Sequence, residues 1–146
     1  SPNVGRRSLG LSVAIDGSTV VGGAPDTGVE GKRDAGAALV FPSSGDGQLA
    51  QTSKLISSTP AEDARIGRSV AIGDSMILVG SESVDGGRGA LLSYALKGMD
   101  DRTETKVFAR GGAGEGLGFS VAIDGDLVIS GSPQDRGRGS ATVFSK

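Results

Sequence analysis

The stretch "GFSVAIDGDLVISGSP", residues 118–133, has two close copies elsewhere in this chain of 146 residues. One copy, "GLSVAIDGSTVVGGAP", covers residues 10–25, and the other, "GRSVAIGDSMILVGSE", covers residues 67–82. In every copy an apolar run follows a serine, a Gly/Asp pair interrupts it, and a second apolar run ends at a glycine. The triplication therefore governs the architecture of the whole chain.

The copies define a repeat with a constant interior and variable connections. The serines that open the first apolar run, Ser12, Ser69 and Ser120, are 57 and 51 residues apart, whereas the first and last glycines of each copy are always 13 residues apart. A period near 50 residues is typical of solenoids and propeller blades. The pattern predicts rigid units joined by loops of different length.

The constant interior predicts a β-hairpin in each unit. An Asp-Gly pair between β-branched runs favours a two-residue turn, because both residues tolerate positive φ. The returning runs are almost continuously apolar, which predicts strands buried on both faces. The predicted turns are Asp16-Gly17, the inverted pair Gly73-Asp74, which could form another turn type, and Asp124-Gly125, with chain exits at Gly23, Gly80 and Gly131.

A third apolar run follows each hairpin, and a fourth follows in the first two units. The third runs are Ala37–Phe41, Ala90–Tyr94 and Ser140–Phe144, and the fourth are about Gln51–Ile56 and Thr105–Ala109. Four antiparallel strands in about 50 residues is the plan of a β-propeller blade. We predict an all-β chain with a single repeat region over residues 1–146 and three blades, at about 9–56, about 66–109 and, incomplete, about 117–146.

Composition limits both the core and the classes of function. With 26 Gly, 36% hydrophobic and 3% aromatic residues, the core must be thin and built from Val, Ile, Leu and Ala. A net charge of −2 argues against a nucleic-acid partner. No apolar run reaches the length of about 18 residues that a membrane helix needs, so we predict no membrane insertion.

The chain has no His and no Cys, which removes the usual general base, the thiolate nucleophile and the usual zinc ligands. Paired carboxylates remain conceivable, because their spacing is spatial and not sequential. The available ones, Glu62, Asp63, Glu104 and Glu115, fall in polar stretches that predict solvated loops. We predict no catalytic residues and no enzymatic activity.

The repeat resembles the FG-GAP repeats of integrin α-subunit-type β-propellers over essentially the whole chain. The "GAP" element reads Gly23-Ala24-Pro25 in the first unit and becomes "GSE" and "GSP" in the others. The Phe of the "FG" element is replaced by an aliphatic residue at Leu9, Ile66 and Leu117. The resemblance implies a propeller scaffold, a role in adhesion or protein binding, and a place outside the cell or at its surface.

Calcium binding is not carried over from that resemblance. Many family members have a D-x-D-x-D-G calcium loop between the first two strands, whereas this chain has only a tight turn there. Such a turn cannot supply the six or more oxygen ligands that calcium prefers. A looser calcium site would have to use Asp26, Asp34, Asp85 and Asp135 from the next loops, and the alternative is that they cap turns. We predict no cofactor.

Three blades do not close a propeller, which usually has about four to eight. The interpretation that we favour is that the chain is part of a longer repeat protein. The alternative is that two chains make six blades, with the segment "SPNV" of residues 1–4 completing a neighbour's last blade. An unpaired blade edge would otherwise favour aggregation.

The loops after the second strands differ most between units, and binding residues concentrate on such loops. Their cations, Lys32, Arg33, Arg88 and Arg138, are candidates for contacts with an acidic glycan or partner, or are plain solvated residues. The predicted function is a non-catalytic extracellular interaction module whose partners are other protein chains or further blades. The alternatives are an accessory propeller of a larger hydrolase and a glycan-binding lectin, although aromatic platforms for sugars are scarce.

Overall fold

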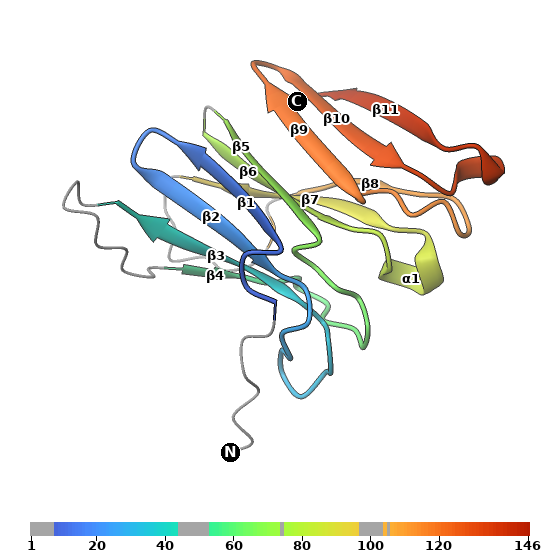
Figure 1. Cartoon of the computed structure of the whole chain (residues 1–146), viewed down its shortest axis with the longest axis horizontal. Helices are drawn as coiled ribbons and strands as arrows, with labels where there is room; N and C mark the ends of the chain where they lie inside the picture. Colours follow the sequence, from blue (N-terminus) through green and yellow to red (C-terminus); the bar gives the residue numbers. More distant parts are fainter. Residues whose placement is uncertain (1–7, 44–52, 74, 97–103, 105) are drawn as a thin grey trace.

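The computed structural model describes residues 8–43, 53–73, 75–96, 104 and 106–146. Within these ranges the chain forms three antiparallel β-sheets and almost no helix (Figure 1). The helical segments are α1 (Val84–Gly87) and a 3-10 turn (Asp135–Gly137), each a single short turn in a loop. The prediction of an all-β chain is confirmed.

Strands that follow one another in the chain are hydrogen-bonded neighbours in each sheet. The first sheet contains β1 (Ser12–Asp16), β2 (Thr19–Ala24), β3 (Ala37–Pro42) and β4 (Ser53–Leu55). The second contains β5 (Ser69–Gly73), β6 (Met76–Ser81), β7 (Ala90–Ala95) and β8 (Lys106–Arg110). The third contains β9 (Ser120–Asp124), β10 (Leu127–Ser132) and β11 (Ser140–Ser145). The predicted runs match these strands, except that residues 51, 52 and 105 lie outside the described ranges.

The turns of the first and third hairpins lie one residue later than predicted. In the third, Asp124 pairs with Leu127, so the central pair of the turn is Gly125-Asp126. In the first sheet, likewise, Asp16 is the last paired residue before the turn and Gly17 is the first central residue of the turn. Gly17 and Gly125 have φ of 54° and 50°, and a positive φ at the first central position alone is the pattern of a type II′ turn. The predicted central pairs were therefore wrong by one residue, because the turn needs Gly first.

The second hairpin turn differs in composition and in the role of its glycine. Gly73 ends β5, where it pairs with Met76, and its φ is not positive. A Cβ on Gly73 would lie 3.1 Å from Cγ2 of Ile123, so the residue makes room for the third sheet. Asp74, the other residue of this predicted turn, lies outside the described residues.

The predicted exit glycines, Gly23, Gly80 and Gly131, lie inside strands and not in turns. A Cβ on Gly23 would overlap the backbone carbonyl of Gly67, and a Cβ on Gly80 would overlap that of Gly118. Glycine is used here because the backbone of the next sheet approaches closely, and not because the chain must turn. The prediction that these residues are turn positions was wrong.

The sheets follow one another in chain order, with β1 against β5 and β5 against β9 (Figure 1). A larger core lies between the first two sheets and includes Val21, Ile77 and Tyr94. A smaller core between the second and third sheets includes Leu78 and Val128. The core is aliphatic apart from a few aromatic rings, as the composition predicts.

The expectation that every returning strand is buried on both faces holds best for β6, in the middle sheet. In β2 the last four residues are buried, whereas Thr19 and Val20 are half-buried. Val79 in β6 and Val128 in β10 are both 0% exposed. Along β6, five successive residues are buried, whereas burial alternates along β10 because only one of its faces is covered. The expectation was wrong for β10, because no described segment lies on the outer face of the third sheet.

Candidate functional site

The described loops that join the strands, apart from the short hairpin turns, leave from one end of the structure, which we name the loop end (Figure 1). It contains the loops after β2, β6 and β10 and the connections from β4 to β5 and from β8 to β9. The sheets are stacked with corresponding strands in the same direction, so corresponding loops lie together. The short hairpin turns lie at the opposite end. Variable loops on a rigid scaffold are the usual place of binding residues.

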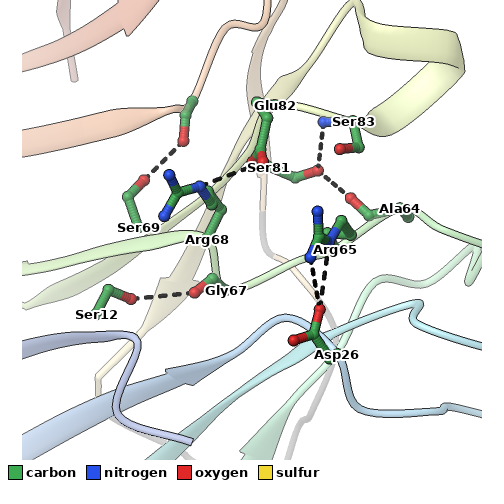
Figure 2. Close-up of polar contacts among 11 residues, drawn as sticks. Ser12, Asp26, Ala64, Arg65, Gly67, Arg68, Ser69, Ser81, Glu82 and Ser83 are labelled. Atoms are coloured by element: carbon green, nitrogen blue, oxygen red, sulfur yellow. Dashed lines mark hydrogen bonds and ion pairs between the residues drawn. The ribbon is translucent and has the colours of Figure 1, made fainter. Parts of the chain in front are cut away.

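An ion pair at the loop end connects two of these loops. Arg65, from the connection between β4 and β5, donates to Oδ1 of Asp26, after β2, with an Nη2–Oδ1 distance of 2.9 Å (Figure 2). Ser8 donates to the other oxygen of Asp26. The hydrogen bond to Asp26 raises the pKa of Arg65, against a smaller opposing effect of burial. Both oxygens of Asp26 are therefore engaged within the chain.

The predicted cation Arg33 is also paired. Its Nη2 lies 3.1 Å from Oδ1 of Asp63, and both side chains are mostly exposed. An exposed pair of this kind stabilises a protein by less than about 1 kcal/mol, so its main effect is to neutralise two charges at the loop end. Arg33 is consequently less available to a partner than the sequence suggests.

The other predicted cations are exposed, and among the described residues no salt bridge reaches them. Each belongs to the loop after the second strand of a different sheet: Lys32 in the first, Arg88 in the second and Arg138 in the third. The structure does not bring them into one pocket. It spaces them along the loop end, one for each sheet.

The four aspartates considered for calcium do not form a site. Within the described ranges, no three acidic side chains gather into a group that could hold a metal ion. Asp34 and Asp85 have φ of 47° and 53°, a left-handed conformation that Asp tolerates in turns. Asp135 lies 3.8 Å from Nε of its neighbour Arg136. The loop geometry agrees with the alternative role of these residues in turns.

Two of the loop carboxylates considered for a catalytic pair, Glu104 and Glu115, accept hydrogen bonds within the chain. Glu104 accepts hydrogen bonds of 2.7 Å from the amide and the hydroxyl of Ser58. Glu115 accepts one of 2.6 Å from the amide of Gly112. These contacts order the loops, and they place the carboxylates in separate connections.

Arg68, which joins two sheets at the loop end, was not among the residues predicted from the sequence. Its guanidinium lies 4.4 Å from the ring centroid of Phe119. Its Nε lies 3.2 Å from Oε1 of Glu82 (Figure 2). A signal was present, because Arg68 and Phe119 both directly precede the repeated serine. Phe119 is the most exposed described aromatic residue, and Arg68 covers part of its ring, which leaves little aromatic surface for a sugar.

The Tyr94 hydroxyl is a buried titratable group away from this surface. It donates a hydrogen bond of 2.9 Å to the carbonyl of Ile56. Burial raises the pKa of Tyr94, and the charge of Glu104 adds to the effect. The hydroxyl faces the core between the first two sheets and so belongs to packing.

Comparison with known proteins leaves the family unassigned. No family model and no curated protein matches the sequence. Among solved structures, the chain is similar to the computationally designed Ika8 protein, with a TM-score of 0.45 and 13% identity over 92% of this chain and 45% of that one. The chain thus spans less than half of that designed chain. Within the described ranges, no helix is long and apolar enough to cross a membrane.

Proposed function

We propose that the three sheets are blades of a propeller-type scaffold and that the chain is a non-catalytic interaction module. The observation that carries this proposal is the contrast between three hairpins of equal register and the variable loops gathered at one end. Rigid repeats that present variable loops suit recognition of another macromolecule. The resemblance to FG-GAP repeats supports the same role and suggests adhesion outside the cell or at its surface.

The charges at the loop end suggest the chemistry of the partner. Lys32, Arg88 and Arg138 carry exposed positive charges that no described residue neutralises by a salt bridge, whereas Arg33 and Arg65 are paired. Three spaced cations fit an extended acidic surface better than a small anion, since they do not converge. We therefore expect the partner to be a protein with an acidic surface.

The test measures binding of a polyglutamate peptide to the chain by fluorescence anisotropy at two salt concentrations. Heparin is the second probe. The variant Lys32→Ala, Arg88→Ala, Arg138→Ala should bind the peptide at least about tenfold more weakly, and binding should fall with added salt. The matched control is Arg33→Ala, which removes a paired cation and should change little. An equal loss of peptide affinity in the triple variant and in Arg33→Ala would contradict the proposal. So would a lack of peptide binding by the original chain. Strong binding of heparin alone would support a glycan partner instead.

A further inference from the structure

Within the described residues, the first and third sheets each have one apolar face that no other segment covers. On the third sheet we name the trailing face, with Ala122, Leu127, Ile129, Ala141 and Val143. Ile129 and Val143 are 40% and 58% exposed, and a shallow groove of about 260 Å³ runs over this face. In the repeat register, Ile129 corresponds to Val21 and Leu78, which are fully buried under the next sheet.

On the first sheet we name the leading face, with Leu9, Val13 and Ile15. Val13 and Ile15 are both 69% exposed. Their counterparts do the opposite: Val70 is 8% exposed and packs on the first sheet, and Val121 packs on the second. The leading face thus carries the side chains that, in the other two sheets, cover the sheet before.

The same serine-to-carbonyl hydrogen bond occurs at both junctions between neighbouring sheets. On the outer faces of the two end sheets, the equivalent serine and the equivalent carbonyl do not meet within the described structure. Ser12 donates through Oγ to the carbonyl of Gly67 at 3.0 Å, and Ser69 donates to that of Gly118 at 2.7 Å (Figure 2). The corresponding hydroxyl is that of Ser120, which is exposed. The corresponding carbonyl is that of Gly10, whose φ of 91° is close to the 98° of Gly67.

A backbone contact repeats in the same way. Gly36 forms a parallel bridge with Ile66, and the amide of Leu117 donates to the carbonyl of Arg88 beside the equivalent bridge of Gly89. A Cβ on Gly36 would overlap the backbone of Ile66. The next glycine in this series is Gly139, with φ of 83°, and no backbone of a following sheet lies close to it in the described structure.

We infer that a second copy of this chain places its leading face on the trailing face. Val13 and Ile15 of one copy then cover Ile129 and Val143 of the other, Ser120 donates to the carbonyl of Gly10, and Leu9 reaches Gly139. The internal junctions carry this inference, because they show which surface fits the trailing face and which contacts accompany it. The inference does not rest on the proposed binding at the loop end.

Two copies related by two-fold symmetry form two such junctions and leave neither face exposed. The junction joins different surfaces, so it closes into a ring only if the rotation allows. Two copies supply six sheets, which lies within the range of about four to eight that closed propellers use. A closed pair also removes the apolar surface that would otherwise favour aggregation.

Sedimentation analysis over a range of protein concentrations tests the inference. The original chain should have twice the mass of one chain. Val13→Lys and Val143→Lys should each sediment with the mass of one chain, because each variant loses one of the two faces. Both should keep the far-UV circular dichroism spectrum of the original chain, which shows that they are folded. The matched control is Ser18→Lys, an exposed turn position that adds the same charge away from both faces, and it should remain paired.

Mixing the two variants separates this junction from other ways of pairing. Val13→Lys retains a good trailing face and Val143→Lys retains a good leading face, so an equimolar mixture should recover the mass of a pair. Pairing through two trailing faces would leave Val13→Lys paired and would overturn the inference. A single-chain mass for the original protein at every concentration, or no recovery in the mixture, would also overturn it.

Discussion

The second and third sheets are built from the same repeat but differ in what covers them. β6 and β7 in the second sheet are buried almost throughout, whereas β10 is buried only at alternate residues and β11 is mostly exposed. The second sheet lies between two others, whereas in the described part of the chain the third sheet has a neighbouring sheet on one side only. The repeated strand sequence therefore places apolar side chains on both faces of each sheet. The number of neighbouring sheets determines whether one face or both faces are buried.

The glycines make the same comparison at the level of the backbone. A Cβ on Gly80 would overlap the carbonyl of Gly118 in the next sheet, whereas a Cβ on Gly131 would meet only atoms of its own hairpin partner, Ser120. Glycine at this position is required by the close approach of the next sheet. Gly131 in the third sheet is also a glycine, although no described sheet follows it. The three predictions below test this difference, and for the first two the background is Val13→Lys, so that self-association does not enter.

The largest effect is expected from an acidic residue in the second sheet. Val79→Asp places a carboxylate in the core between the first two sheets, where Val79 is fully buried, and should lower the free energy of unfolding by more than about 4 kcal/mol. Ile129→Asp in the third sheet should cost less than about 1 kcal/mol, since that side chain is partly exposed. Urea unfolding measures both. Similar losses for the two variants would show that the third sheet is covered in solution.

A smaller effect is expected from adding one methyl group at the junction glycines. Gly80→Ala should lower the free energy of unfolding by about 2 kcal/mol, because the second and third sheets must move apart. Gly131→Ala should cost less than about 1 kcal/mol, because the Ser120 side chain can rotate away. Thermal unfolding distinguishes the two. If Gly131→Ala were as costly as Gly80→Ala, the glycine would be needed within the strand and not by the junction.

The smallest effect concerns pH and the aromatic residue at the end of each third strand. Burial raises the pKa of Tyr94 in the folded chain above its value of about 10 in the unfolded chain. As pH rises, the tyrosine of the unfolded state therefore loses its proton before that of the folded state. The contribution of Tyr94 to the free energy of unfolding is complete below about pH 10 and falls above it, by up to about 1.4 kcal/mol per pH unit. Tyr94→Phe should lack this part of the alkaline loss when unfolding is measured between pH 9 and 11.

The double variant Tyr94→Phe, Phe144→Tyr is the matched comparison for the third sheet. The chain has one tyrosine, so tyrosinate absorbance reports on a single hydroxyl in each protein. Because Phe144 is only half-buried, a tyrosine at that position should titrate nearer to its ordinary value than Tyr94 does. Equal titration curves would mean that both third strands have the same environment.

Local patterns were sufficient to predict most of the strands. The runs beginning at Ser12, Ser69 and Ser120 and the third runs after Gly36, Gly89 and Gly139 all form strands at the predicted places. The hairpin turns were misplaced by one residue, because an Asp-Gly pair alone does not show which residue takes the positive φ. The role of Gly23 and Gly80 could not be predicted at all, since the carbonyl that excludes a side chain comes from the next sheet.

The candidate site was less predictable than the fold. Sequence reasoning found the loops of the loop end and their cations, because insertions and charged residues mark loops. It could not show that Arg33 and Arg65 are neutralised by Asp63 and Asp26, since each pair joins two separate loops. It also missed Arg68 on Phe119, a contact between residues of adjacent sheets.

The sequence by itself determined the repeat, the all-β class, the strand order within each hairpin and the aliphatic character of the core, because these depend on local periodicity and turn chemistry. Only the tertiary structure decided which apolar faces are buried, which glycines are junction residues and which charges remain unpaired. These properties depend on how one sheet lies against the next, and contacts between residues about 50 positions apart are not written in any short stretch of the chain. The stretch at 118–133 shows the division most clearly: it specifies a hairpin with two apolar faces, and the stacking of sheets covers one of them.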